Sequence, residues 1–166
     1  MPPFTSELLM EHHDISAFRS GHDSLDEWLR QRARSVALRG TGRTFIWHRG
    51  DDKVVAYYTL AAHLVARKGL PSRIGRGGPQ EIPAVLLAKL VLDISWQGQG
   101  LGGELLVDAF SRVVRATQTV AARVVVVDAI DETAVRFYEH HGFRRVPESA
   151  RLVQKISDIA AALDAR

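Results

Sequence analysis

The 166-residue sequence contains no cysteine. This absence excludes disulfide bonds, thiolate ligands to a metal and a cysteine nucleophile. No apolar run approaches the roughly 18 residues that a membrane-spanning helix needs, and the segment from Met1 to Glu7 has neither a basic leader nor the apolar core of a signal peptide. We therefore expect a cytoplasmic protein that does not enter a membrane.

Acidic residues are scarce in one long segment. From Trp28 to Gln80 the only carboxylates belong to Asp51 and Asp52, against 11 lysines and arginines, although the net charge of the whole chain is only +3. A local excess of positive charge attracts polyanions, and both nucleic acid and coenzyme A fit that description. A solvated basic surface without a partner stays open as the alternative.

The remaining composition is that of a globular domain. Apolar residues make up 46% of the chain and charged residues 25%, with no repeats or low-complexity tracts. The length suits one domain over residues 1–166. His12 and His13 are adjacent, so their side chains are expected to point to different sides of any helix or strand, and we predict no metal site.

The segment from Leu90 to Thr117 organises the rest of the sequence. A short apolar run ends at Leu92, a glycine-rich turn follows from Gln97 to Gly103, and apolar residues then recur at helical spacing up to Val114. The glycines therefore lie at a helix N-terminus, where unpaired N–H groups and the helix dipole attract anions. This arrangement predicts a pyrophosphate-binding turn.

Three kinds of turn compete for these glycines. Gly98-x-Gly100-x-x-Gly103 matches the dinucleotide fingerprint, with Asp128 placed as a ribose-binding acid, but only 38 residues follow Asp128 and a dinucleotide fold needs several more βα units. A Walker loop needs a Lys-Ser/Thr ending that Gly103-Glu104 lacks. A glycine turn that binds nothing stays open.

Hydrophobic patterning predicts the elements around this turn. Ser24 to Glu27 form a capping box that predicts a helix to about Leu38, and Asp131 is a plausible N-cap for a helix ending before Gly142. We predict strands over residues 4–9, 44–47, 54–60, 89–93, 123–128, 143–146 and 152–155 and a terminal helix over 156–163. Residues 63–83 lack periodicity and are predicted to form a basic loop.

The same glycine turn contains Gln97-x-x-Gly100-x-Gly102. This resembles the acetyl-CoA pyrophosphate motif of the GNAT acetyltransferase superfamily, Gln/Arg-x-x-Gly-x-Gly/Ala. Phe18 to Gly21 followed by Leu25 to Leu29 resembles the N-terminal signature of GNAT toxins from type II toxin–antitoxin modules, of the TacT and AtaT kind. The resemblance implies an α/β (α+β) GNAT fold, with a central mixed, mostly antiparallel sheet flanked by helices and a splayed strand pair that binds acetyl-CoA.

The resemblance also implies the site residues. Tyr138 occupies the general-acid position, although its spacing alone would suit a core tyrosine, and the free N–H groups of Val91 or Leu92 would stabilise the oxyanion. The implied cofactor-binding residues are Leu90, Val91, Leu92, Gln97, Gly98, Gln99, Gly100, Leu101, Gly102, Gly103, Asp131, Ala134 and Phe137. The basic residues expected to contact nucleic acid are Arg67, Lys68, Arg73, Arg76 and Lys89, the last standing where the family commonly has Arg.

The function that the resemblance implies is that of an N-acetyltransferase toxin. Such a toxin uses acetyl-CoA as co-substrate to acetylate the amino group of aminoacyl-tRNA, which inhibits translation. The implied partners are acetyl-CoA, aminoacyl-tRNA and a ribbon-helix-helix antitoxin, and a homodimer is expected. Two alternatives remain open: a GNAT enzyme acting on a small amine or a protein N-terminus, and a non-enzymatic module that binds CoA or a nucleotide.

Overall fold

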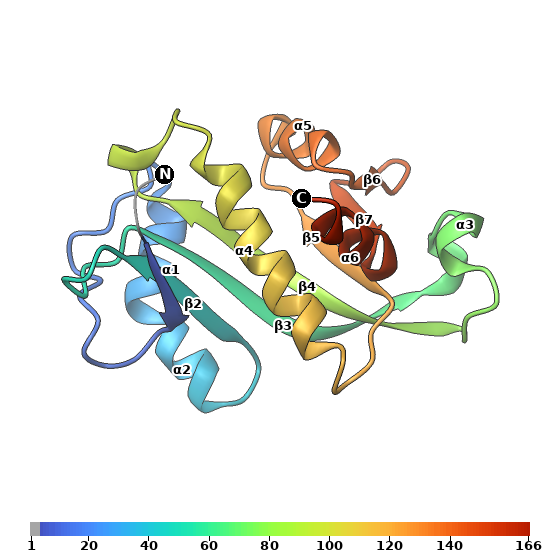
Figure 1. The fold of residues 1–166 in the computed structure, drawn as a ribbon, viewed down its shortest axis with the longest axis horizontal. Helices are drawn as coiled ribbons and strands as arrows, with labels where there is room; N and C mark the ends of the chain where they lie inside the picture. The colour runs from blue at the N-terminus through green and yellow to red at the C-terminus, as the bar shows by residue number, and fades with distance from the viewer. Residues whose placement is uncertain (1–3) are drawn as a thin grey trace. The chain divides into compact units, whose positions relative to one another are not determined.

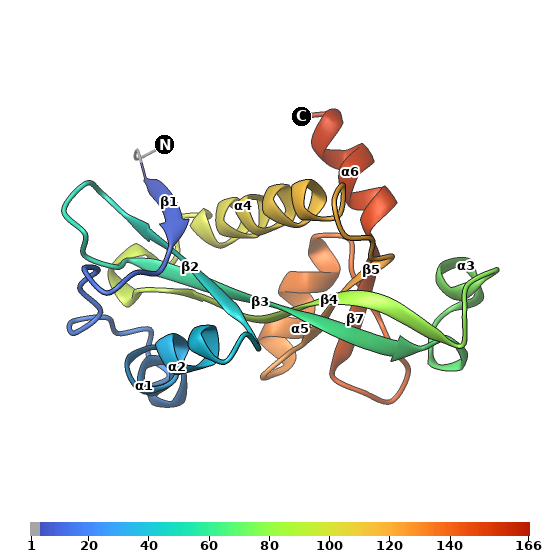
Figure 2. The same cartoon turned by 90° about the horizontal axis from the view of Figure 1, so that it is seen from below.

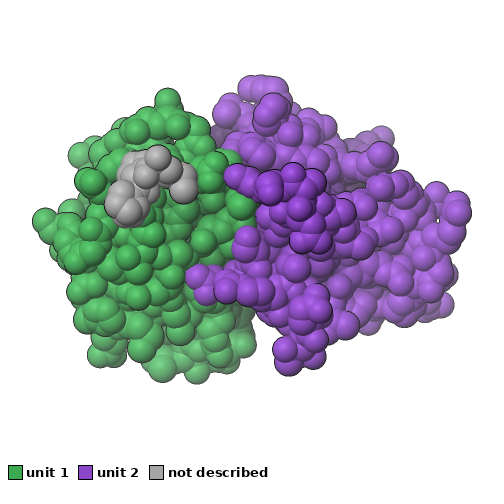
Figure 3. Space-filling model, in the orientation of Figure 1, with its two compact units in different colours: residues 1–61, 88–108 green, residues 62–87, 109–166 purple. Residues whose placement is uncertain are grey.

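The computed structural model describes residues 4–166 (Figure 1). They divide into two compact units (Figure 3). Unit 1 comprises the residues up to Ala61 together with Ala88–Asp108, and unit 2 comprises Ala62–Leu87 together with Ala109–Arg166. Each unit is built from segments that are distant in the sequence.

One seven-stranded sheet contains all the strands, in the order β1-β2-β3-β4-β5-β7-β6. The β1–β2, β2–β3, β5–β7 and β6–β7 pairs are antiparallel, and the β4–β5 pair is parallel. The predicted mixed, mostly antiparallel sheet is therefore confirmed.

Unit 1 is formed around β1 (Thr5–Leu8), β2 (Arg43–His48) and the first part of β3 (Ala56–Ala66). Helices α1 (Asp23–Gln31) and α2 (Ala33–Leu38) lie on one face of these strands, and the start of α4 lies on the other (Figure 2). A core of buried side chains fills the space toward α1, among them Phe18, Leu29, Ile46, Tyr57 and Val91.

The predicted helix over residues 24–38 is wrong in two respects. The chain breaks at Arg32, whose φ of −121° separates α1 from α2, and α1 starts one residue before Ser24, with His22 as N-cap and no side-chain cap. The Asp26 carboxylate is instead buried and accepts hydrogen bonds from the N–H and hydroxyl groups of Ser20. The capping box fails because the helix already begins at Asp23, which places Ser24 within its first turn and not at the N-cap.

Unit 2 contains the end of β3, the short helices η1 (Arg67–Gly69) and α3 (Ser72–Gly75), and the start of β4 (Glu81–Leu92). The predicted loop over residues 63–83 is therefore too long, because β3 runs to Ala66 and β4 begins at Glu81. Leu70 and Ile74, which lie between the two strands, are buried in the core of this unit. Their spacing is too short to give a periodic signal in the sequence.

The remaining elements of unit 2 agree with the predictions within a few residues. They are β5 (Val124–Asp128), α5 (Glu132–His140), β6 (Arg144–Arg145), β7 (Arg151–Lys155) and α6 (Ile156–Asp164). Val124 to Val127 are almost fully buried, as expected for an internal strand.

The predicted central helix is α4 (Leu101–Ala116), preceded by the short helix η2 (Ile94–Trp96). Its apolar residues, from Leu101 to Val113, are buried at helical spacing. None of the helices in residues 4–166 has the length and hydrophobicity needed to cross a bilayer.

Candidate active site

The glycine turn of unit 1 joins η2 to α4, as predicted. Gly98 and Gly100 both adopt a φ of +78°, a conformation that disfavours any side chain. The N–H groups of Gly98 to Gly100 donate to no backbone acceptor in the described chain, and the first N–H groups of α4 have no partner within the helix. The turn therefore presents a row of free donors to an anion.

Two side chains fix the entry to this turn. Asp93 accepts hydrogen bonds from the N–H groups of Arg19 and Ser95; burial alone would raise the pKa of Asp93, but these donors hold it below its ordinary value. The side-chain amide of Gln97 donates to the carbonyl groups of Ser20 (2.7 Å) and Leu92 (2.9 Å). Gln97 thus anchors the turn through its side chain.

Asp128, the candidate ribose ligand of the dinucleotide alternative, has a partner. Its two carboxylate oxygens accept from Arg151 at 2.8 and 2.9 Å, and this hydrogen bonding lowers the pKa of Asp128. The carboxylate of Asp128 therefore serves to join β5 to β7. Because Asp128 is paired with Arg151, the glycine turn favours pyrophosphate binding and the dinucleotide alternative loses its ribose-binding acid.

The end of β4 carries the predicted oxyanion donors. The parallel register pairs Ala84–Leu86 of β4 with Val124–Val126 of β5. Val91 and Leu92 lie beyond these paired residues, at the carboxyl end of β4. The side chain of Val91 is buried in the core of unit 1, which fixes the backbone of the strand at this point.

Tyr138 lies on α5 in unit 2. Its ring packs edge-on against Phe137 and Phe143, and burial raises the pKa of Tyr138 well above the ordinary tyrosine value. The other two tyrosines of the chain donate their hydroxyl groups internally, Tyr57 to the Leu25 carbonyl and Tyr58 to the Asp108 carboxylate. The Tyr138 hydroxyl has no such partner in the described residues, so it remains a protonated, unused donor.

The start of α5 is fixed by its cap. The Asp131 carboxylate accepts from the N–H of Ala134 at 2.8 Å, as the sequence predicted. The Phe137 ring packs against the ring of His141 with centroids 4.6 Å apart. Helix α5 therefore contains Ala134, Phe137 and Tyr138 and is capped by Asp131.

Four of the five predicted basic residues lie in or next to η1 and α3 in unit 2. Arg67, Lys68 and Arg76 line a pocket of about 330 Å³. Arg73 and Arg76 line a neighbouring groove of about 730 Å³ together with Arg123 and Lys155. The sequence analysis missed the last two, which come together because Arg123 immediately precedes β5 and the β5–β7 register places Lys155 opposite Val124.

These cations differ in how freely they can bind an anion. The Arg67 guanidinium donates to the Gly78 carbonyl, and Arg73 forms an ion pair with Asp158 at 3.1 Å. Lys68 and Arg76 are exposed and form no ion pair within the described residues. Lys68 and Arg76 are consequently the freest of the predicted phosphate contacts.

Lys89, the fifth predicted basic residue, belongs to unit 1. Its ammonium group is 4.7 Å from the centroid of the Trp28 ring on α1. The residue is half-buried, and this burial lowers the pKa of Lys89. Lys89 is therefore not an ordinary exposed phosphate contact.

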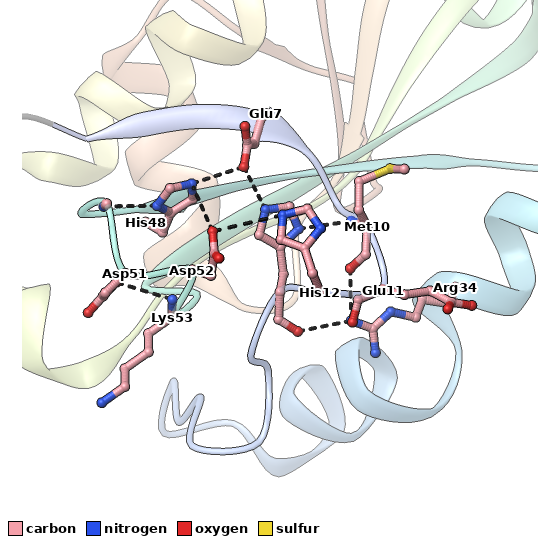
Figure 4. Close-up of polar contacts among 11 residues, drawn as sticks. Glu7, Met10, Glu11, His12, Arg34, His48, Asp51, Asp52 and Lys53 are labelled. Carbon is pink, nitrogen blue, oxygen red and sulfur yellow. Dashed lines mark hydrogen bonds and ion pairs between the residues drawn. The ribbon is translucent and has the colours of Figure 1, made fainter.

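A second polar cluster of unit 1 joins β1 to the β2–β3 hairpin (Figure 4). His13 and His48 are buried, and their Nε2 atoms lie 2.6 and 2.9 Å from the same oxygen of Glu7. His12 and Asp52 complete the cluster, with 3.8 Å between His12 Nε2 and Asp52 Oδ1. The rings of His12 and His13 lie only 4.1 Å apart, so the expectation of diverging side chains is wrong; both lie in a turn, where strand and helix periodicity does not apply.

The hydrogen bonds in this cluster determine what it can bind. The Met10 and Gly50 backbone N–H groups donate to Nδ1 of His13 and His48, each at 2.9 Å. Nδ1 is therefore unprotonated in both rings, and each Nε2–H donates to Glu7. A neutral histidine that binds a metal through Nε2 must carry its proton on Nδ1, so this geometry favours the Glu7 carboxylate over a metal ion.

Comparisons with known proteins agree with the fold and with the glycine turn before α4. The acetyltransferase (GNAT) domain family matches residues 78–160. A tRNA-acetylating toxin of Mycobacterium tuberculosis is 40% identical over 134 residues, which cover 81% of this chain and 80% of the relative.

Two solved structures of the toxin AtaT are also similar. AtaT complexed with acetyl-methionyl-tRNAfMet is 27% identical, with a TM-score of 0.88 over 96% of this chain and 99% of that one. A tyrosine-to-phenylalanine mutant of AtaT, bound to the C-terminus of the antitoxin AtaR and acetyl-CoA, is 26% identical, with a TM-score of 0.81 over 96% and 97% of the two chains. The chain belongs to the GNAT acetyltransferases, as an N-acetyltransferase that uses acetyl-CoA, among the acetyltransferase toxins of the AtaT kind.

Proposed function

We propose that this chain transfers the acetyl group of acetyl-CoA to the amino group of aminoacyl-tRNA and thereby removes that aminoacyl-tRNA from translation. The observation that carries the proposal is the 40% identity to a tRNA-acetylating toxin over four-fifths of both chains. The basic pocket and groove of unit 2 support it, because they provide cations for a nucleic acid backbone.

Acetyl-CoA binding is assigned to the glycine turn. The free N–H groups from Gly98 to Gly103 would hold the pyrophosphate at the N-terminus of α4, where the helix dipole adds to their attraction. Leu90, Val91 and Leu92 would contact the acetyl and pantetheine end, and Asp131, Ala134 and Phe137 would contact the remainder of the cofactor. Splaying of β4 from β5 would expose the N–H groups used in catalysis.

The chemistry is a direct attack. The neutral amine attacks the thioester carbon, and the N–H of Val91 or Leu92 donates to the oxyanion that forms. Collapse of this intermediate breaks the C–S bond, and the Tyr138 hydroxyl supplies a proton to the CoA thiolate. The surplus proton of the amine passes to water, and the Tyr138 tyrosinate takes up a proton from water to restore the enzyme. The absence of cysteine excludes a cysteine acetyl-enzyme, and direct attack needs no other covalent intermediate.

The basic groove is assigned to the tRNA backbone. Lys68 and Arg76 would neutralise phosphates directly, because no carboxylate of the described chain occupies them. Arg67 and Arg73, together with Arg123 and Lys155, would extend the positive surface. Phosphate contacts of this kind position a tRNA without reading its sequence.

The proposal extends to the partners. The bound antitoxin segment in the AtaT structure supports an antitoxin for this chain as well. We propose that it is of the ribbon-helix-helix type, that the toxin forms a homodimer built from one GNAT domain per chain, and that it acts in the cytoplasm, where aminoacyl-tRNA is used.

The test is acetyl transfer from labelled acetyl-CoA. The purified protein is incubated with total charged tRNA or with the same tRNA after deacylation, and label is counted in the precipitated tRNA. We expect label only on charged tRNA. Label on free amino acids, small amines or protein N-termini, with none on charged tRNA, would contradict the proposal.

A further inference from the structure

Lys89 is a half-buried cation without a counter-ion. Its ammonium group forms no ion pair with any carboxylate in residues 4–166 and lies 4.7 Å from the centroid of the Trp28 ring. Partial burial of an uncompensated charge is unfavourable, as the lowered pKa of Lys89 indicates. An apolar side chain at position 89 would avoid this cost. A purely structural role therefore does not explain the lysine.

The position of this charge is fixed by a small aromatic platform. Trp28 stacks on Tyr57, with ring centroids 6.2 Å apart and planes 9° from parallel. Tyr57 is fully buried and donates its hydroxyl to the Leu25 carbonyl of α1. A cation held over an aromatic face keeps its charge while losing part of its hydration. The Lys89 ammonium group is thus held in place and can interact electrostatically with a bound ligand.

Lys89 lies on β4, the strand that carries the proposed oxyanion donors. Side chains two residues apart on a strand point to the same face, with Cα atoms about 7 Å apart. Lys89 and Val91 stand in this relation on β4, and the N–H of Val91 or Leu92 is the proposed oxyanion donor. An amine that attacks an acetyl group held by these donors would approach this end of β4, near the Lys89 ammonium.

We propose that Lys89 is an acceptor-site residue whose fixed positive charge disfavours the protonated form of the acceptor amine, so that the amine binds as the neutral nucleophile. The proton leaves to bulk water. The inference rests on the proposed function, and it accounts for how an acetyltransferase can use aminoacyl-tRNA at neutral pH without a general base. A free α-amino group has a pKa of about 7.7 to 8.0, so only a minority of it is neutral there.

The effect of this charge belongs to the enzyme–substrate complex. The pH dependence of kcat/KM reports the ionisation of the free amine, whereas that of kcat reports the amine in the complex. A positive charge on the order of 8 Å away, at an effective dielectric constant between that of a protein surface and that of bulk water, lowers the pKa of an amine by about one unit. The kcat profile should therefore rise at a lower pH than the kcat/KM profile.

The test compares Lys89→Met, which removes the charge and keeps the length, with Lys89→Arg, which keeps the charge. The kcat and kcat/KM values for aminoacyl-tRNA are measured across pH, and acetyl-CoA binding with thermal unfolding confirms that each variant is folded. For Lys89→Met we expect the acid limb of kcat to move up by about one pH unit, an approximately tenfold loss on the acid side that vanishes at alkaline pH. For Lys89→Arg the acid limb of the kcat profile should stay at the wild-type pH, even if the maximal kcat differs.

Each other outcome overturns the inference. Loss of kcat by the same factor at every pH would assign Lys89 a packing role. Loss of the acid limb of kcat in both variants would show that Lys89 acts as a general base. Profiles identical to that of the wild type would show that Lys89 has no part in the reaction. A wild-type protein that acetylates no aminoacyl-tRNA would overturn the proposed function and this inference with it, an outcome distinct from a normal wild-type rate with an unaltered Lys89→Met profile.

Discussion

Unit 1 contains the histidine cluster and the half-buried Lys89, which differ in whether their polar atoms have partners. In the cluster of Glu7, His13 and His48, backbone N–H groups and one carboxylate satisfy the ring nitrogens of both histidines. Lys89 has an aromatic ring beneath its charge and no counter-ion. The first arrangement stabilises the fold and leaves no bonding capacity for a ligand, whereas the second keeps its charge available.

The same distinction separates the three tyrosines. Tyr57 and Tyr58 donate their hydroxyl groups to internal acceptors, whereas the Tyr138 hydroxyl has none among the described residues. The internal hydrogen bonds of Tyr57 and Tyr58 thus indicate structural roles, whereas the Tyr138 hydroxyl remains available for the proposed reaction.

The largest effect should come from removing the Tyr138 hydroxyl. Tyr138→Phe should lower kcat by about 100-fold or more, because the CoA thiolate loses its proton donor, while the melting temperature stays close to that of the wild type. Steady-state acetylation and thermal unfolding check both statements. Tyr58→Phe is the matched control: it should lower stability by about 1 kcal/mol, since Asp108 loses a donor, and retain kcat. Equal kcat losses in the two variants would remove the distinction.

A second prediction separates exposed cations from the half-buried one. The double variant Lys68→Gln/Arg76→Gln should raise the KM for aminoacyl-tRNA about tenfold or more and reduce the slope of log KM against log salt by about two, because two phosphate contacts are lost. The pH dependence of kcat should not change. Arg39→Gln, an exposed residue at the end of α2, serves as control and should keep the salt slope. An unchanged slope in the double variant would contradict the assignment.

The smallest effect concerns the histidine cluster. Glu7→Gln should lower the melting temperature at neutral pH and leave kcat unchanged. Hydrogen bonds from His13 and then His48 lower the pKa of Glu7 from its ordinary value of 4.5, so its stabilisation is complete above that value and disappears as the pH falls through the lowered pKa. The difference between wild type and variant should therefore vanish in acid. Thermal unfolding across pH measures it, with exposed Glu11→Gln as control.

Zinc provides an independent check on the same cluster. Because both Nδ1 atoms accept backbone hydrogen bonds, added Zn²⁺ should not raise the melting temperature of the wild-type protein. A zinc-dependent increase that Glu7→Gln abolishes would show that the histidines change tautomer and bind metal.

Elements with strong local signals could be predicted from the sequence. The helix from Leu101, the Asp131 cap and the buried run Val124 to Val127 each depend on periodicity or on a single capping residue. Residues 63–83 could not be predicted correctly, because Leu70, which follows η1, and Ile74 of α3 are buried in one core cluster with residues of β5 and β7. The role of Asp26 likewise depends on its hydrogen bonds to Ser20, which residue spacing alone does not indicate.

The candidate site was predictable in part for similar reasons. The glycine turn follows from residue types and helix position, whereas the role of Tyr138 required the family resemblance. The groove residues Arg123 and Lys155 are distant in sequence and meet only through the β5–β7 register. The half-buried state of Lys89 depends on Trp28, which is 61 residues away and on another element.

The most direct test of the account identifies the atom that receives the acetyl group. Charged tRNA is incubated with acetyl-CoA and the protein, digested with nuclease, and the released aminoacyl-adenosine is analysed by tandem mass spectrometry. We expect one additional acetyl group, located on the α-amino nitrogen of the amino acid. An acetyl group on the ribose or base, or an unmodified aminoacyl-adenosine beside full acetyl-CoA binding, would contradict it.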